Sequence, residues 1–572
     1  MHKDSGDCKT ETNAVRLAGS FFKEGRTGVL MYSAVFFIYA ALLLLVCTRN
    51  SPLFTYQTWV DPNIYMDVGK SVQSGLVLYR DVFDHKGPLL LLCFSVLSRI
   101  SPHSMTSVYL LQSITLGISL SYLFRTAKLF LSKTESFALT LIFPFFLLNT
   151  FTYGTGGGSA EELLLPCFMG GMFYIIRAFL PANDASRFML PGNTPPGQFV
   201  TASGNNQEVR YRVWDFFFLG LLAGIVIMTK INLAVFFAAG CAGLFALFFF
   251  TKQRQRLIKS CGLFFAGIFT AALPCLIYFT ATNSFKDFWN VYITFNLQYA
   301  SAAANDSNRM TFLGALDRGL FLNLAAVLCI AGGFLAFLII RKRAAFYGAV
   351  SLIILFAVTL TAVYISGRAY LYQYIPNLCF TGVGEIGICL ALQNLQIKLS
   401  NKVLLRKPSA AVRAAAFAII AAGIIGSNTL YTQIRFFQPE KTGVEKISDT
   451  ILETWQPKKE GETPSILLFN TGDIGFFDLT ESQPKLRVFY MPMINLNRYP
   501  DLLLAQQGYI NSGLADYIIC IGYSKEFDYG VTDLNPKYQM IDLQGQYIDS
   551  TLNVIKLYAK TSTAESDISR SN

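Results

Sequence analysis

Long apolar runs, separated by short polar loops, dominate the pattern of hydrophobic and polar positions along this chain. The runs fall near 28–48, 105–124, 136–153, 160–180, 213–229, 232–250, 257–281, 312–340, 344–365, 375–395 and 410–430. A helix of about 20 apolar residues is long enough to cross the hydrocarbon core of a bilayer. The pattern therefore predicts a polytopic α-helical membrane protein with about 11 transmembrane helices.

The apolar run 87–100 is shorter than the others, and about 10–14 residues are too few for a confident span. We expect it to lie at the interface or to re-enter the membrane from one side. This choice places nearly every compact basic cluster, such as those at 252–259 and 341–343, on the same face. Because Lys and Arg concentrate in cytoplasmic loops, the N-terminal segment 1–27 is predicted to be cytoplasmic and the first long loop, 49–104, extracytoplasmic.

The C-terminal part of the chain has a different pattern, with short segments typical of strands. Strands are predicted at 465–469, 486–490, 517–522, 538–543 and 552–558, with a helix at 500–512. We expect a small extracytoplasmic α/β domain over 440–560, after a transmembrane module over 28–431. The segment 181–212, rich in Pro, Gly, Asn and Ser, predicts a flexible cytoplasmic loop, and the polar tail 561–572 predicts disorder.

Composition supports a membrane protein and argues against a nucleic-acid partner. Hydrophobic residues make up 53% of the 572 residues and charged residues 15%, and the mean hydropathy is +0.41. A soluble protein with that balance would expose large apolar patches. The net charge of +11 is carried by short loops between apolar runs, as cytoplasmic loops require. We therefore expect a multi-pass protein of the plasma or inner membrane that binds no nucleic acid.

The first long loop contains an acidic residue, Asp61, directly before Pro62. Asp followed by Pro is a favoured pair at the start of a helix, and Ile64 and Val68 lie on one helical face behind it. Capping of a helix is therefore one interpretation of Asp61. A carboxylate at a helix start also lies at the membrane surface with one oxygen free, so a catalytic role is compatible with capping.

The end of the same loop carries four polar residues directly before Gly87-Pro88 and a short apolar run. They are Asp81, Asp84, His85 and Lys86. The apolar run that follows holds His85 and Lys86 at the level of the lipid headgroups. A cation at that level can pair with a lipid phosphate. A solvated loop is the alternative.

Three further polar groups stand next to apolar runs. Glu161 and Glu162 begin a spanning run after a Gly-rich turn, where they suit the helix dipole or supply a second carboxylate facing Asp61. Lys230 lies between two apolar runs with almost no loop around it, so it either snorkels to the interface or serves a function. Arg368 occurs with several tyrosines on the predicted outer face, and an aromatic belt explains the tyrosines but not the arginine.

Taken together, these residues resemble a family. The similar stretches read Asp61-Pro62-x-x-Tyr65, Gly75, Tyr79-Arg80-Asp81-x-x-Asp84-His85-Lys86-Gly87-Pro88-Leu89 and Thr229-Lys230. They look like the polyprenyl-phosphate-sugar-dependent glycosyltransferases of the GT-C superfamily, in the branch of protein O-mannosyltransferases and lipid A aminoarabinose transferases. The family commonly shows Asp-Glu where this chain has Asp61-Pro62, and His-Tyr where it has Gln373-Tyr374.

The resemblance implies an inverting transfer of a sugar from a polyprenyl phosphate to a hydroxyl of a cell-surface glycan, lipid or protein. Asp61 would take the acceptor proton, with Glu161 or Glu162 as the alternative base. The donor phosphate would be bound by cationic groups, namely Lys86, Lys230, Arg368 and His85. Further candidate site residues are Asp81, Asp84, Tyr65 and Tyr374. No cofactor is required, although paired carboxylates are compatible with a divalent metal.

Two other functions remain as alternatives. A transporter or flippase of lipid-linked saccharides would also be polytopic, but such proteins often show internal repeats and charges near mid-membrane, and no convincing repeat is found here. An oligosaccharide ligase or polymerase would use a similar outer-face site with a longer donor. The sequence does not separate that enzyme from a single-sugar transferase.

Overall fold

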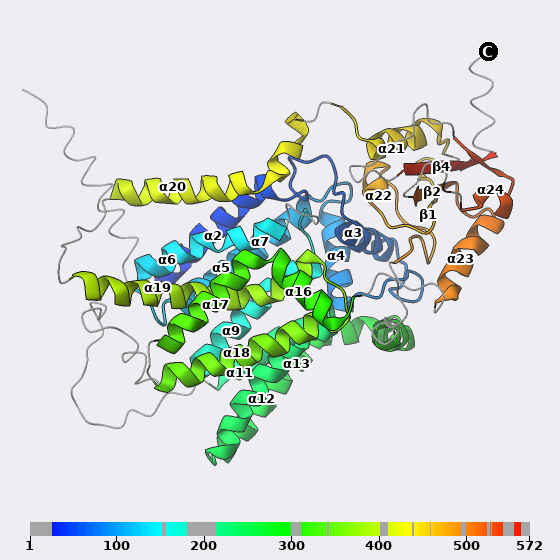
Figure 1. Cartoon of the computed structure of the whole chain (residues 1–572). Helices are drawn as coiled ribbons and strands as arrows, with labels where there is room; N and C mark the ends of the chain where they lie inside the picture. The colour runs from blue at the N-terminus through cyan, green and yellow to red at the C-terminus, as the bar shows by residue number, and fades with distance from the viewer. Residues whose placement is uncertain are drawn as a thin grey trace, which may run out of the picture.

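The computed structural model describes residues 26–150, 156–179, 213–298, 310–339, 343–400, 410–437, 440–457, 459–492, 499–522, 527, 529–541 and 554–561. The predictions for most of the N-terminal segment, for the loop 181–212 and for nearly all of the tail 561–572 therefore lie outside the described residues. Within them, the chain is mostly helical, with a small sheet near its C-terminal end (Figure 1).

The first half of the helix bundle also carries the predicted first long loop. Its helices are α2 (Arg26–Cys47), α3 (Val60–Gln73), α4 (Pro88–Ile100), α5 (Thr106–Ala127), α6 (Lys133–Ile142), α7 (Pro144–Thr150), α8 (Ala160–Leu163), α9 (Leu165–Phe179), α11 (Trp214–Thr229), η2 (Ile231–Ala234), α12 (Val235–Phe250) and α13 (Arg254–Ala281). The long helices α11 and α13 pack closely. A Cβ at Gly220 of α11 would lie only 1.9 Å from the Phe264 carbonyl oxygen of α13, so this contact requires glycine.

The second half of the bundle begins with two short helical elements. Its helices are α14 (Phe285–Phe288), η3 (Trp289–Phe295), α16 (Phe312–Leu322), α17 (Leu324–Ile339), α18 (Arg343–Tyr364), η5 (Leu371–Asn377), α19 (Leu378–Ser400), α20 (Ala410–Ser427), η6 (Thr429–Gln433) and η7 (Arg435–Phe437). The π-helical turn η3 exposes about half of Trp289 and buries Tyr292, so it is amphipathic, as a segment lying on a membrane surface is expected to be.

Several helices are long and apolar enough to cross a membrane. By length and composition the described residues hold five, at Leu30–Cys47, Thr106–Ala127, Ile231–Phe250, Arg254–Ala281 and Leu371–Leu395. A sixth is added if the pair Phe312–Leu322 and Leu324–Leu338, bent by 90°, is one span. The predicted class of polytopic α-helical membrane protein is therefore confirmed, whereas the count of about 11 spans stays a prediction. The run 87–100 forms α4, a helix of 13 residues.

The C-terminal domain, defined here as residues 443–560, contains a four-stranded sheet. Its elements are α21 (Gly443–Thr454), β1 (Ile466–Leu468), α22 (Phe476–Leu479), α23 (Pro500–Asn511), β2 (Tyr517–Gly522), α24 (Val531–Leu534), β3 (Tyr538–Met540) and β4 (Val554–Lys560). The strand order is β1-β2-β4-β3, with β1 parallel to β2 and the other pairs antiparallel. The predicted α/β class of this region is therefore confirmed.

One predicted strand, 486–490, does not form. Within it, the Phe489 carbonyl accepts a hydrogen bond from the Leu468 amide of β1, but the Arg487 carbonyl accepts one from the Phe83 amide in the first long loop. The segment therefore divides its backbone hydrogen bonds between the sheet and the loop, which prevents a regular ladder. This difference matters because the segment brings the C-terminal domain against the loop.

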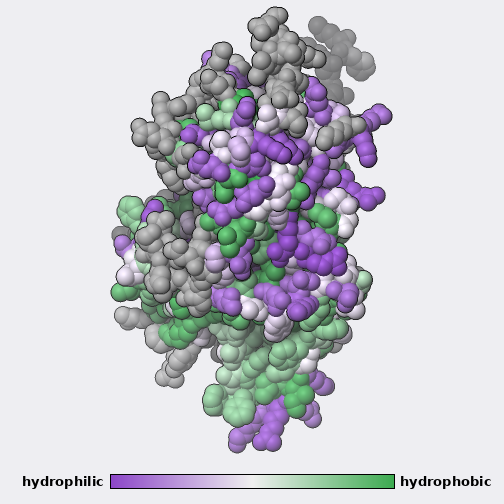
Figure 2. All heavy atoms as spheres, turned by 90° about the vertical axis from the view of Figure 1, so that its right-hand side faces the viewer, coloured by the Kyte–Doolittle hydropathy of each residue, from purple (hydrophilic) through white to green (hydrophobic). Residues whose placement is uncertain are grey.

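The C-terminal domain and the first long loop share one apolar core. Ile64 and Phe94, from α3 and α4, belong to the same buried cluster as Phe476 and Phe489 from the domain. In Figure 1 the domain lies at one end of the bundle, against α3 and α4. Figure 2 shows that the face of the molecule on that side is largely hydrophilic, while the α12–α13 hairpin protrudes as a hydrophobic surface with a hydrophilic tip. The face on the domain side and the tip of this hairpin are thus polar, with hydrophobic surface between them.

Candidate active site

Asp61 lies in the first turn of α3 but does not cap it. The N-cap is Trp59, and no side chain accepts a hydrogen bond from the first amides of α3, so the capping interpretation of Asp61 is wrong. Its carboxylate instead faces other side chains: Asp61 Oδ2 accepts a hydrogen bond of 3.1 Å from the Tyr65 hydroxyl and lies 3.6 Å from Lys86 Nζ. About a fifth of the Asp61 side chain is exposed, so the carboxylate remains accessible.

Lys86 is held by its backbone while its ammonium group faces Asp61. The Lys86 amide donates to Asp84 Oδ1 (2.7 Å), and the Lys86 carbonyl accepts from the Tyr79 hydroxyl (2.6 Å). The ammonium group lies 5.8 Å from the centre of the Tyr65 ring, a favourable cation–π distance. Burial opposes the charge of Lys86, but the nearby carboxylates, Asp61 above all, outweigh burial and raise its pKa. Lys86 is therefore a permanent cation.

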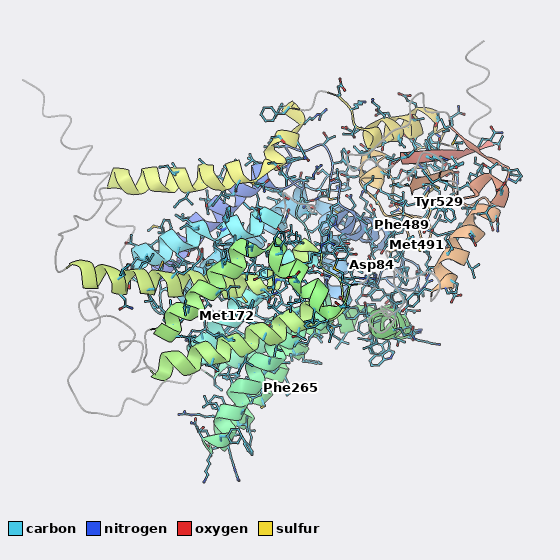
Figure 3. The ribbon with its side chains drawn as sticks, in the orientation of Figure 1. Asp84, Met172, Phe265, Phe489, Met491 and Tyr529 are labelled. Carbon is cyan, nitrogen blue, oxygen red and sulfur yellow. The ribbon has the colours of Figure 1, made fainter. Side chains whose placement is uncertain are left out.

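Asp84 connects the loop to the C-terminal domain. It is fully buried, and its second oxygen, Oδ2, accepts a hydrogen bond of 3.1 Å from the Tyr490 hydroxyl. Burial raises the pKa of Asp84 to about 6, although the charge of Lys86 and the hydrogen bonds act in the opposite direction. Figure 3 shows Asp84 beside Phe489 and Met491, at the junction between the bundle and the domain. Tyr490 was not a candidate from the sequence, because nothing local indicates a contact across 406 residues.

Lys230 is brought to the site by a close contact between two chain segments. The Gly87 amide donates to the Thr229 carbonyl (3.1 Å), and a Cβ at Gly87 would lie 2.3 Å from the Met228 carbonyl oxygen. The start of α4 and the end of α11 therefore touch through glycine, directly beside Lys86 and Lys230. Lys230 has extended backbone between α11 and η2, and its ammonium group donates to Glu161 Oε1 (2.5 Å).

The two adjacent glutamates of α8 have different surroundings. Glu161 pairs with Lys230, whereas Glu162 accepts hydrogen bonds from the Gly158 amide and the Gln112 side chain, each of 2.7 Å. Both oxygens of Glu162 are thus occupied in holding the Gly-rich turn against α5. The structure places Glu161, and not Glu162, beside the lysines.

We define the carboxylate–lysine cluster as Asp61, Lys86, Glu161 and Lys230. Burial raises the pKa of Tyr65, and the charges of both Asp61 and Glu161 raise it further. Tyr65 is therefore near both ion pairs, which shows that the two pairs are neighbours. The four side chains come from three parts of the sequence and from four elements or loops. Two carboxylates and two cations therefore meet at the end of the bundle that carries the C-terminal domain.

His85 and Arg368 lie next to this cluster. Burial lowers the pKa of His85 well below its usual range, and so does the positive charge of three cations around it, which are Lys86, Lys230 and Arg368. His85 is therefore neutral, and any contact with a phosphate would be a hydrogen bond without charge. Arg368 also lies within electrostatic range of Tyr372, as do Asp61 and Glu161.

Two predicted candidates are not brought to the cluster. Tyr374 is fully buried in the apolar core of the bundle. Tyr372, two residues before it, faces the site instead, and the centre of its ring lies 5.0 Å from the centre of the Trp59 ring. Tyr374 and Tyr372 lie in the 3-10 turn η5, where side chains two residues apart point in different directions. Asp81 pairs with Arg80 through both oxygens, at 3.1 Å each, and accepts from the Val77 amide. Asp81 therefore shapes the loop.

A metal site is not formed by the residues that the structure describes. Among them, no group of three or more His, Cys, Asp or Glu side chains is arranged to hold an ion. Asp61 and Glu161 each face an ammonium group instead of each other. The predicted compatibility with a divalent metal therefore finds no fitting set of ligands here, and no step is assigned to a metal.

No protein-family model and no curated protein matches the chain. Among solved structures, the chain is similar to the crystal structure of ArnT from Cupriavidus metallidurans bound to undecaprenyl phosphate, with a TM-score of 0.53 and 12% identity over 93% of this chain and 98% of that chain. The apo state of the same protein gives a TM-score of 0.54 and 11% identity, over 94% and 98%. The Archaeoglobus fulgidus oligosaccharyltransferase in the apo form gives 0.48 and 12%, over 85% and 69%. The likeness to ArnT, a GT-C protein, confirms the GT-C fold.

Proposed function

We propose that this chain, which has the GT-C fold, is a membrane glycosyltransferase that moves a sugar from a polyprenyl phosphate to a hydroxyl group of an acceptor. The observation that carries the proposal is the carboxylate–lysine cluster at one end of an apolar bundle. A lipid-linked donor places its phosphate at that level, with its chain among the helices. One of the similar ArnT structures is bound to undecaprenyl phosphate, a lipid phosphate of the same chemical class as this donor.

The carboxylates and the lysines of the cluster have different roles in the reaction. The acceptor oxygen attacks the anomeric carbon, the bond from that carbon to the phosphate oxygen breaks, and the acceptor proton passes to Asp61. The leaving polyprenyl phosphate gains about one negative charge in this step. Lys86 and Lys230 stabilise that charge more strongly in the transition state than in the bound donor, which is the condition for catalysis. Attack opposite the leaving group predicts inversion.

The two ion pairs hold Lys86 and Lys230 in place before the donor binds. Each lysine is about a fifth to a quarter exposed, whereas Glu161 is almost fully buried. A buried cation without a partner is costly, so Asp61 and Glu161 stabilise Lys86 and Lys230 before the phosphate arrives. A phosphate entering from the exposed side meets two ammonium groups held at the end of the bundle.

The same proposal includes the membrane arrangement predicted from the sequence. The N-terminus would be cytoplasmic, and the predicted α/β region 440–560, which includes the C-terminal domain, would be extracytoplasmic. The transmembrane module at 28–431 would lie in the plasma or inner membrane. The basic tip of the α12–α13 hairpin, with exposed Lys252 and Arg254, supports this orientation because it lies away from the domain. The acceptor would be a cell-surface glycan, lipid or protein.

The test is transfer of labelled sugar from a polyprenyl-phosphate donor by the full chain in liposomes. We expect Asp61→Asn to lower kcat by roughly 100-fold or more, the usual effect of removing a general base. Asp449→Asn is the matched control, since Asp449 also pairs with a lysine but is exposed in the C-terminal domain. Full activity of Asp61→Asn would remove Asp61 as the base, and no transfer by the unmodified protein with any polyprenyl-phosphate sugar would contradict the function.

A further inference from the structure

The C-terminal domain reaches the candidate site through one hydroxyl group. Tyr490 is 4% exposed and donates to Asp84, which is fully buried and accepts from the Lys86 amide through its other oxygen. A chain of two hydrogen bonds, 3.1 and 2.7 Å long, therefore connects the domain to the backbone of Lys86. These hydrogen bonds join segments that are distant along the chain, because Tyr490 follows Asp84 by 406 positions.

A second contact fixes the same loop from the same segment of the domain. The Arg487 carbonyl accepts from the Phe83 amide (2.9 Å), and the Arg487 guanidinium donates to the Arg80 carbonyl (2.9 Å). The loop residues that precede Asp84 are thus tied to the domain through their backbone groups. Tyr490 differs from these contacts because it acts on a side chain that touches Lys86 directly.

We propose that the C-terminal domain completes the active site and that Tyr490 is a positioning residue, which holds Lys86 against the donor phosphate through Asp84. This inference rests on the proposed transferase function. The hydrogen bond of the Tyr490 hydroxyl goes to Asp84 and not to a cluster residue, so its effect on the position of Lys86 passes through Asp84. A carboxylate that accepts two hydrogen bonds cannot rotate freely, and the Lys86 backbone that it holds directs the ammonium group toward Asp61.

The charge of Asp84 is part of this arrangement. The hydrogen bonds that Asp84 accepts from both neighbours are strongest while the carboxylate is ionised, and burial raises its pKa to about 6. The charged and titratable groups that face it are Lys86, His85 and Asp61 from its own loop and from α3, Tyr65 and Tyr79 from the same region, and Tyr490 from the domain. Because the hydrogen bond from Tyr490 lowers the pKa of Asp84, removal of that hydroxyl shifts its ionisation to higher pH.

The experiment compares Tyr490→Phe with Tyr538→Phe in the full chain. Tyr538 is a matched control, since it is also fully buried in the C-terminal domain and donates one hydrogen bond, to the Ala515 carbonyl, far from the loop. We measure donor KM and kcat from pH 5 to 8, and hydrogen exchange at the Lys86 amide. Tyr490→Phe should lower kcat/KM about tenfold, corresponding to about 1.4 kcal/mol, and move the acidic limb of the profile to higher pH. Tyr538→Phe should do neither.

The outcomes separate this inference from the proposed function. Equal kinetics and equal pH profiles for the two variants would overturn the role of Tyr490 while leaving the transferase intact. If the unmodified protein transfers no sugar, the proposed function fails, but hydrogen exchange at the Lys86 amide still tests the positioning contact. Faster exchange in Tyr490→Phe supports the contact, and unchanged exchange contradicts it. If Tyr490→Phe does not fold, Asp84→Ala, which removes the acceptor of the Lys86 amide, should give the same faster exchange at this amide, and unchanged exchange there also counts against the contact.

Discussion

At the scale of single residues, neighbours in sequence have unlike roles because their side chains leave the backbone in different directions. Glu161 and Glu162 show this most clearly: one carboxylate faces Lys230, and the other is enclosed by the Gly-rich turn and Gln112. The same holds for Tyr372 and Tyr374 in η5, of which Tyr374 is in the core. Residue type alone therefore does not assign a role.

Substitution of each glutamate by glutamine tests this division. Glu162→Gln places an amide where both partners donate, so we expect a loss of about 1–3 kcal/mol in stability, seen as a lower Tm. Glu161→Gln removes the carboxylate that competes with the donor phosphate for Lys230, so we expect a lower donor KM. It also removes the partner of Lys230, but the fall in Tm should be smaller than for Glu162→Gln because Lys230 is partly exposed. Thermal unfolding and donor titration measure the two effects. A reversed pattern, with Glu161→Gln unstable and Glu162→Gln kinetically altered, would exchange their roles.

At the scale of elements, the site depends on a contact between the start of α4 and the end of α11. Both lysines lie just outside these helices: Lys86 precedes α4 and Lys230 follows α11. The hydrogen bond from the Gly87 amide to the Thr229 carbonyl brings the two ends together, with no room for a side chain at position 87. The separation of the two cations is thus set by backbone packing.

Gly87→Ala is expected to separate these ends, because the new Cβ would meet two backbone carbonyls, at 2.3 and 2.4 Å, that cannot rotate away. A displacement of about 1 Å at a catalytic group costs roughly 100-fold in rate, so we expect a loss of kcat/KM of that order. Gly262→Ala in α13 is the control, since nothing lies within 4 Å of its Cβ. Transfer assays on both variants are the measurement, and equal activity would show that the contact tolerates a side chain.

At the scale of the whole molecule, the C-terminal domain is joined to α3 by a buried group of charges as well as by the shared core. Lys70 Nζ lies 3.9 Å from Asp67 Oδ1 and 3.6 Å from Asp478 Oδ1, and all three side chains are largely buried. Asp67 Oδ2 and Asp473 Oδ2 are both buried, and a proton held between these two carboxyl groups would join them by a hydrogen bond. Burial, and then the charge of Asp473, raise the pKa of Asp67 well above its usual range, and burial raises the pKa of Asp473 to about 6.

These shifts predict how stability depends on pH. A carboxyl group whose pKa is higher in the folded state stabilises the fold while it is protonated, and this contribution is lost as pH rises through the folded pKa. We therefore expect Tm to fall between pH 5 and pH 8. Asp67→Asn should raise Tm at pH 8 and flatten this dependence, because an amide keeps the contact to Asp473 without charge. Asp449→Asn, at an exposed ion pair, should leave the pH dependence of Tm unchanged. Thermal melts of both variants between pH 5 and pH 8 test this prediction.

The sequence determined those features of this protein that depend on neighbouring residues. Apolar runs predict helices because helix formation and membrane insertion respond to a local stretch of chain, and the C-terminal pattern predicted four of its strands for the same reason. Lys86 was identifiable because a polar cluster followed by Gly87-Pro88 and an apolar run is visible in one segment. The unusual position of Lys230 between two apolar runs was visible in the same way.

The tertiary structure alone decided which of these groups meet. The pairing of Lys230 with Glu161, and the hydrogen bond from Tyr490 to Asp84, join residues 69 and 406 positions apart. Such contacts depend on how helices and domain pack, and no local pattern records that packing. The failure of 486–490 to form a strand has the same cause, because its partner for hydrogen bonding is a loop from the other end of the chain. The local sequence therefore specifies the helices and strands, whereas the packing of distant segments brings the residues of the site together.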